Sequence, residues 1–246
     1  MLTKNNIKFI KSLQLKKFRQ KERLFIVEGE KNTVELLLSN YAIETLLIST
    51  DFSKKYSDLI QENSCPVEIT DARTISTLGT YSSNNMSLAV VKEPEEKVFN
   101  NSGVQLILDD IRDPGNLGTI IRIADWYGLQ NVICSNTSAE FYNPKVISAS
   151  MGSVFKINLF REDLNLFLTK YPHVKVYGAL MEGENVHKMQ FENNAFVIIG
   201  NESHGISTSL TEKIDHKITI PRIGKAESLN AAMATAVICD NIYRNI

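Results

Sequence analysis

Long apolar runs and cysteines are both scarce in this chain of 246 residues. No apolar run approaches the roughly 20 residues that a membrane-spanning helix needs, and the first residues lack the apolar core of a signal peptide. The three cysteines, Cys65, Cys134 and Cys239, lie far apart in or beside apolar stretches, which predicts reduced, buried thiols in a cytoplasmic protein. The four histidines do not pair with cysteines at zinc spacing, so we expect no metal site.

The small net charge of −1 is distributed unevenly along the chain. Residues 1–23 contain eight Lys or Arg and one acid, Glu22, which gives this segment +7 and leaves −8 for the remainder. A basic segment on a neutral or acidic body is an electrostatic footprint for phosphate. We therefore favour RNA contact by this segment over the alternative of a solvated basic helix.

Strands and helices alternate along residues 1–91, as is typical of a small, layered α/β domain. Apolar spacing predicts helices over 5–13, 16–23, 30–38, 51–61 and 71–78, and strands over 24–27, 43–48, 66–69 and 86–91. Residues 92–103 are charged and then rich in turn formers, so we interpret them as a linker between domains.

Residues 104–246 predict a second α/β domain with a mostly parallel sheet. Strands are expected at 104–108, 131–134, 154–159, 174–179, 196–199 and 218–220, with helices between them. Ligands of such sheets bind beyond the carboxyl ends of the strands. The last helix, after Leu229, has hardly any polar face, so we expect it to be buried on all sides, with Ser228 as its N-cap.

Three polar motifs follow the ends of predicted strands in this second domain. They are Asn116-x-Gly118-x-x-x-Arg122, then Gly200-x-Glu202-x-x-Gly205, then Ile220-Pro221 with Ser228-Leu229-Asn230. In this order they resemble the three motifs of the SpoU branch of the SPOUT RNA ribose methyltransferases. The resemblance covers roughly residues 104–246.

The resemblance implies a knotted SPOUT-type fold, a homodimer, and methyl transfer from S-adenosylmethionine to a ribose 2′-hydroxyl of RNA. It also implies that residues 1–91 form an RNA substrate-binding domain, and domain order and size favour ribosomal over transfer RNA. It implies a cofactor pocket formed by backbone groups around Gly200, Ile220 and Leu229. We add Ala179, because a predicted strand ends there in small residues. The predicted cofactor-binding residues are Gly200, Ile220, Leu229 and Ala179.

Arg122 is the first candidate for catalysis, because the resemblance gives it the activation of the 2′-hydroxyl. A guanidinium has a pKa above about 12 and is a poor literal base. We therefore prefer a role in binding the adjacent RNA phosphate and stabilising the developing oxyanion. The structural alternative is an ion pair with Asp125, three residues further along the helix.

The other catalytic candidates are polar residues of the same motifs. Asn116 suits either a helix N-cap or the positioning of the ribose, and Glu202 is expected to order Asn116 or Arg122. Ser228 and Asn230 are expected to hydrogen-bond to substrate or cofactor.

Three alternative functions compete with methylation of ribosomal RNA. One is the same reaction on transfer RNA, and another is an RNA-binding protein of this fold without catalysis. The third is a dinucleotide enzyme of doubly wound type, which is suggested by Gly115 and Gly118 following a predicted strand. Their spacing fails the G-x-G-x-x-G pattern.

Overall fold

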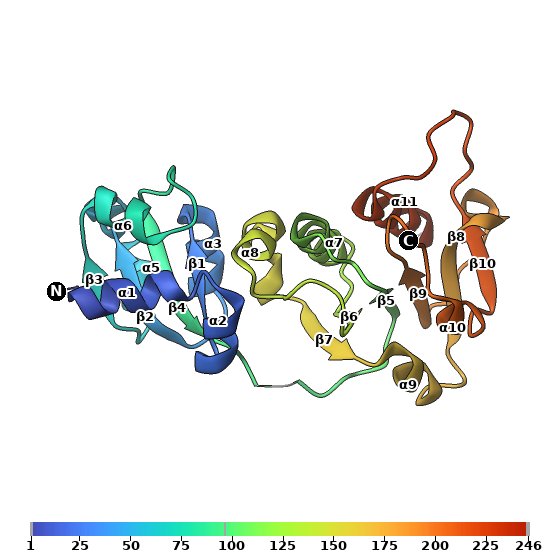
Figure 1. The fold of residues 1–246 in the computed structure, drawn as a ribbon, viewed down its shortest axis with the longest axis horizontal. Helices are drawn as coiled ribbons and strands as arrows, with labels where there is room; N and C mark the ends of the chain where they lie inside the picture. Colours follow the sequence, from blue (N-terminus) through green and yellow to red (C-terminus); the bar gives the residue numbers. More distant parts are fainter. Residues whose placement is uncertain (1, 96, 245–246) are drawn as a thin grey trace. The chain divides into compact units, whose positions relative to one another are not determined.

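The computed structural model describes residues 2–95 and 97–244 and divides them into two compact units. The first unit takes residues 2–95 together with 142–155, and the second takes 97–141 together with 156–244. Figure 1 labels the elements of both units. The first unit therefore contains a segment from within the stretch that we expected to form the second domain.

The first unit is built on a four-stranded sheet in the order β1-β4-β2-β3. The strand β4 (Ser87–Lys92) pairs antiparallel with both β1 (Leu24–Glu28) and β2 (Ile43–Ile48), and β3 (Val67–Ile69) runs parallel to β2. The helices α1 (Lys4–Ser12) and α6 (Ala72–Leu78) cover one face. Buried apolar residues join them to the sheet: Ile10, Leu13, Ile26, Leu47, Ile75, Leu78, Leu88 and Val90.

The opposite face of this sheet carries an aromatic cluster. Side chains alternate along a strand, so Phe25 points away from the face that Ile26 covers. Tyr142 stacks on Phe25 with ring centroids 4.3 Å apart. Residues 142–155, which include α8 (Pro144–Ser150) and a 3-10 turn η1 (Ser153–Phe155), thereby complete the core of the first unit beside α3 (Glu30–Leu37).

Two predictions about elements of the first unit are wrong. A strand was expected over 154–159, but residues 153–155 form a 3-10 turn and the strand begins only at Asn158. The turn forms because the ring of Phe155 packs edge-on against that of Tyr41, with centroids 5.2 Å apart. The expected helix over 51–61 is split into α4 (Thr50–Lys55) and α5 (Ser57–Gln61) at Tyr56, whose hydroxyl donates to Glu30 at 2.8 Å. The remaining helix, α2, spans Lys16–Glu22.

The second unit is built on a six-stranded sheet in the order β10-β8-β9-β5-β6-β7, in which all neighbouring strands are parallel. The strands are β5 (Val104–Leu108), β6 (Asn131–Ser135), β7 (Asn158–Glu162), β8 (Lys175–Asn185), β9 (Ala195–Ile199) and β10 (His216–Thr219). Strand β8 runs well past its predicted end at 179, and its pairing with β10 shifts register between Lys217 and Ile218. A short turn, η2 (Val186–Lys188), follows it.

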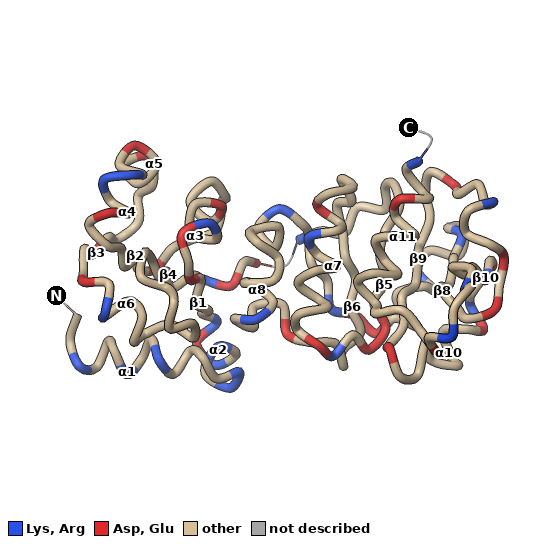
Figure 2. Tube along the Cα trace, turned by 90° about the horizontal axis from the view of Figure 1, so that it is seen from above, with Lys and Arg blue, Asp and Glu red and all other residues tan. Residues whose placement is uncertain are grey.

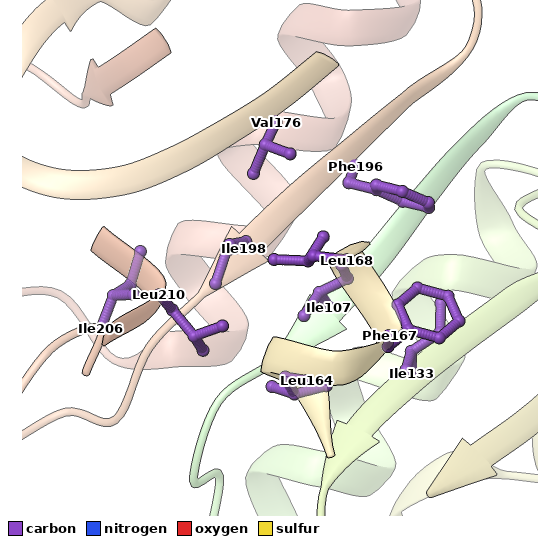
Figure 3. Packing of buried hydrophobic residues seen from close by; sticks show 10 residues of the cluster. All are labelled: Ile107, Ile133, Leu164, Phe167, Leu168, Val176, Phe196, Ile198, Ile206 and Leu210. Carbon is purple, nitrogen blue, oxygen red and sulfur yellow. The ribbon is translucent and has the colours of Figure 1, made fainter. Parts of the chain in front are cut away.

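Helices cover both faces of this sheet. The short helices α9 (Leu164–Thr169) and α10 (Thr208–Thr211) bury one face (Figure 3). Ile107, Phe167 and Ile198 lie in this cluster. The helices α7 (Pro114–Trp126) and α11 (Ala231–Tyr243) pack against each other on the opposite face (Figure 1).

The final helix is only partly buried, which corrects the expectation of burial on all sides. Thr235 and Ile238 of α11 face the core, but Met233 is 61% exposed. Trp126, at the end of the neighbouring α7, is also strongly exposed. No helix among the described residues is long and apolar enough to cross a membrane.

The cysteines divide into two kinds. Cys134 and Cys239 are buried as predicted, and burial raises the pKa of both thiols to about 12. Cys65 is only half-buried, so the prediction was wrong for this residue.

Candidate active site

The first motif lies within α7, which follows the short loop after β5. Pro114 occupies the start of this helix, where its missing N–H costs nothing. Asp113 is the N-cap, and its carboxylate accepts a hydrogen bond from the backbone N–H of Asn116 at 2.9 Å. The suggestion that Asn116 caps the helix is therefore wrong, and its side chain is free for other contacts.

The second motif is a tight hairpin directly after β9. The backbone N–H of Asn201 donates to Gly205 at 3.0 Å, and the N–H of Gly205 donates back at 2.8 Å. A Cβ at Gly200 would overlap the backbone of Gly205 and Ile206. Closure of the loop on itself thus requires glycine here, in addition to any ligand that approaches. Glu202 lies at the turn, half-buried.

The third motif ends in the N-cap of α11, and that cap is Asn230. Its side-chain oxygen accepts from the backbone N–H groups of Ala232 at 3.0 Å and Met233 at 3.3 Å. The prediction that Ser228 caps this helix is wrong, because the helix begins at Ala231 and Ser228 lies in the exposed loop before it.

Side chains from the three motifs join in one hydrogen-bonded chain. The amide nitrogen of Asn116 donates to Glu202, and the amide nitrogen of Asn230 donates to the amide oxygen of Asn116 at 2.9 Å. A carboxylate only accepts and a backbone N–H only donates. Since Glu202 lies at one end and the first turn of α11 at the other, both amide groups have a single consistent orientation.

This arrangement leaves groups for a further ligand. Each amide nitrogen carries two hydrogens and uses one within the network. One N–H of Asn116, one N–H of Asn230 and the second carboxylate oxygen of Glu202 have no partner among the described residues. Together they can both donate to and accept from hydroxyl groups, as binding of a sugar requires.

A cavity of about 960 Å³ adjoins this network. It lies between residues 179–182, 199–206 and 217–229, with Ala231, Ala234 and Ile238 of α11 at one side. Glu202 and Ser228 line the cavity. So do all four predicted cofactor-binding residues, Ala179, Gly200, Ile220 and Leu229. The middle of β8 and the loops after β9 and β10 therefore converge on one space.

Arg122 lies on α7 outside this network. Its side chain is exposed and forms no hydrogen bond or ion pair within residues 2–95 and 97–244. The alternative pairing with Asp125 is absent, and Asp125 lies 3.9 Å from Lys156 instead. The structure thus joins Asn116, Glu202 and Asn230 but leaves Arg122 apart from them.

Residues 103–240 match the model of the SpoU rRNA Methylase family. The chain belongs to this family. Residues 4–80 match a second model, the MRM3-like substrate binding domain. The predicted family and its α/β fold are confirmed, and nothing supports the dinucleotide-enzyme alternative. The knot that the resemblance implies stays a prediction.

Relatives of this SpoU-family chain are similar along almost its full length. The 23S rRNA (guanosine(2553)-2′-O)-methyltransferase RlmP of Bacillus subtilis is 35% identical over 235 residues, which cover 94% of this chain and 93% of that protein. The structure of an AdoMet-bound rRNA methyltransferase from Sinorhizobium meliloti has a TM-score of 0.88 at 26% identity, covering 100% and 97% of the two chains. The SpoU methyltransferase AviRb from Streptomyces viridochromogenes, at 23% identity and a TM-score of 0.87, shares the fold.

Two aspartates of the SpoU-family domain were missed by reasoning from the sequence. Asp109 is buried, and its carboxylate accepts from the backbone N–H of Ser207 at 2.8 Å. The carbonyl of Asp110 accepts from the side chain of Asn201 at 2.8 Å. Asp110 therefore ties the end of β5 to the second motif, and Asp109 ties it to the segment just after that motif. The signal was the pair of acids directly after a buried strand.

Proposed function

We propose that this chain transfers a methyl group from S-adenosylmethionine to the 2′-hydroxyl of a ribose in 23S ribosomal RNA, in the cytoplasm. The network of Glu202, Asn116 and Asn230 beside the cavity carries the proposal, because it offers donors and an acceptor to ribose hydroxyls next to a space for the donor. The ribosomal substrate is supported by the similarity to the Bacillus subtilis enzyme over 94% of the chain.

The cavity fits S-adenosylmethionine in size and chemistry. Its volume of about 960 Å³ lies in the range of small-molecule sites, roughly 300–1,000 Å³. Apolar side chains, such as Ile199 and Ile218, offer contact to an adenine ring, and Glu182 and Glu227 offer negative charge to a sulfonium. When bound, the cofactor supplies an electrophilic methyl group.

The protein's own residues supply positioning and charge. Glu202 and Asn116 hold the ribose by its hydroxyls, and Asn230 keeps the Asn116 amide in the orientation that this requires. Arg122, with an exposed guanidinium, binds the adjacent phosphate and stabilises the oxygen as it loses its proton. Ser228 contributes a hydroxyl at the cavity wall.

The N-terminal unit holds the RNA through the lysines of α1. At 100° per residue, Lys4, Lys8 and Lys11 fall within an arc of about 60° on this helix. Figure 2 marks the Lys and Arg positions along α1 in blue. All three lysines are exposed, and none forms an ion pair in the part of the chain that the structure describes. Arg19 is different, because it is buried and its guanidinium donates to the carbonyls of Leu13 and Gln14.

A homodimer is supported by apolar surface on the two packed helices of the second unit. Trp126 on α7 is 82% exposed and Met233 on α11 is also exposed. Large apolar side chains of this kind gain free energy when a second copy covers them. Light scattering tests this point: a mass of one chain would contradict it.

Methyl transfer from labelled S-adenosylmethionine tests the reaction. The purified chain is given 23S ribosomal RNA or bulk transfer RNA, and the modified ribose is mapped. We expect label in the ribosomal RNA at a 2′-oxygen. Label in transfer RNA alone would favour that substrate, and RNA binding without transfer would favour the non-catalytic alternative.

A matched pair of variants connects the reaction to the network. Glu202→Gln replaces an acceptor by a group that also donates, and we expect it to lower transfer strongly. Glu212→Gln makes the same change at an exposed position outside the cavity and should leave transfer unchanged.

A further inference from the structure

Asp110 has an uncommon backbone conformation at the edge of the candidate active site. Its φ of +59° lies in the left-handed region, which residues other than glycine seldom adopt. The backbone is held from both sides: its N–H donates to the hydroxyl of Ser135 at 2.9 Å, and its carbonyl accepts from Asn201. An uncommon conformation that its neighbours fix in this way is often part of a functional site.

The fixed aspartate orients an arginine. The carboxylate of Asp110 accepts from Nε of Arg112 at 2.8 Å, while the Arg112 side chain stays 67% exposed. Burial of the carboxyl opposes its ionisation, but hydrogen bonds from Arg112 and Thr137 outweigh this effect and hold the pKa of Asp110 below its usual value. Only one nitrogen of the guanidinium is occupied, and the two terminal nitrogens have no partner among the described residues.

This arginine lies on the loop that leads from β5 into α7, the helix that carries the first motif. It directly precedes Asp113, the cap that receives the backbone N–H of Asn116. Its partner Asp110 is bonded to Asn201, the residue before Glu202. Arg112 is therefore tied to both ends of the Asn116–Glu202 contact, at the carboxyl edge of the sheet where substrate must approach.

We propose that Arg112 binds a backbone phosphate of the RNA strand close to the ribose that is methylated. This proposal rests on the proposed function, and it adds a substrate contact that the three motifs do not contain. A guanidinium held at Nε presents its two terminal nitrogens as a preformed fork, which matches phosphate oxygens.

The surrounding charge explains why an arginine is needed at this position. Asp109, Asp110 and Asp113 lie within three residues of it on the same loop. Their field repels a phosphate unless a cation projects beyond them. Arg112 is the exposed cation of this loop, so it is the group that makes the approach of an RNA backbone favourable here.

The competing role for Arg112 is purely structural, as the partner of Asp110. Salt dependence separates the two roles, since each phosphate contact contributes about 0.7–0.9 to the slope of log binding constant against log salt concentration. A structural role has no such signature. Arg112→Gln removes the charge, Arg112→Lys keeps it without the fork, and Arg244→Gln removes another surface arginine paired with an aspartate, Asp240.

The experiment measures RNA binding of the full chain across a salt series, with KM and kcat for methyl transfer to 23S ribosomal RNA. For Arg112→Gln we expect a rise of roughly tenfold in KM for RNA, a slope lower by about one contact, and an unchanged affinity for S-adenosylmethionine. Arg112→Lys should restore the slope and part of the affinity. Arg244→Gln should resemble the wild type.

Three results would overturn the proposal. Unchanged KM and slope in Arg112→Gln would show that no phosphate is bound. Weaker binding with an unchanged slope would indicate a contact to a base instead. Equal losses of RNA binding, cofactor binding and melting temperature would show a structural role. If the wild type transfers no methyl group, the proposed function fails, and the salt slope for RNA binding still decides the role of Arg112.

Discussion

Asn230 has two separable tasks, and one substitution can remove only one of them. Its oxygen caps α11, while its nitrogen donates to Asn116 at 2.9 Å. Aspartate is an equally good N-cap and suits the positive end of a helix dipole, but it has no N–H to donate. In Asn230→Asp the cap therefore persists, while an oxygen now faces the oxygen of Asn116. Rotation of the Asn116 amide does not relieve this contact between two oxygens, since it would turn the amide oxygen toward the carboxylate of Glu202.

The expected magnitudes follow from this geometry. Loss of the hydrogen bond and the new contact between acceptors should cost about 1–2 kcal/mol in the transition state, or about 5- to 30-fold in kcat. Stability should change by less than about 0.5 kcal/mol, since the cap is kept. Asn230→Ala removes both contacts, so we expect the same loss of rate together with about 1 kcal/mol of stability, or about 2–4 °C in melting temperature.

Steady-state methyl transfer and thermal melting of the two variants are the measurements. The reasoning would be refuted by an Asn230→Asp protein with wild-type kcat, because the network would then have no role in the reaction. It would also fail if Asn230→Asp melted as low as Asn230→Ala, because the cap would not have been preserved.

Three further predictions concern other parts of the chain. Gly200→Ala should lower the melting temperature by several degrees, because overpacking against the backbone of Gly205 costs about 1–3 kcal/mol. Gly224→Ala is the control, since open space surrounds Gly224 and the melting temperature should not change. Equal melting temperatures of the two variants would contradict the overlap at Gly200. A thiol reagent at pH 8 should modify Cys65 well before the two buried cysteines, and three equally fast thiols would contradict the burial. Exchange of Lys4, Lys8 and Lys11 for glutamine should lower the salt slope of RNA binding by roughly 2–3, and exchange for arginine should preserve it. An unchanged slope in both variants would exclude RNA contact by these lysines.

The order of motifs in the sequence was enough to predict which loops meet. Parallel strands place their carboxyl ends at one edge, so the residues after β5 and β9 had to be neighbours once the sheet was parallel. Asn116 and Glu202 are joined as this reasoning expected. The N-cap of α11 was harder, because Ser228 and Asn230 are both good caps and only the point where the loop ends decides between them.

Other features could not be predicted because they depend on distant packing. Val154 and Phe155 have strand-like sequence, yet they lie in a 3-10 turn against residues that are more than a hundred positions earlier. The apolar character of α11 indicated burial but not which partner provides it, and Met233 stays exposed in a single chain. The sequence was enough to place Arg122 on a helix, whereas its exposure depends on how α7 packs against the rest of the unit.

The insertion of residues 142–155 into the first unit has a consequence for protein engineering. The polypeptide passes from one unit to the other after residues 95, 141 and 155, so a single cut in the linker does not release the complete first unit. A gene truncated at residue 91 would encode a sheet whose Phe25 lacks its stacked partner Tyr142. Chimeras that graft the first unit onto another enzyme should therefore carry the α8 segment with it.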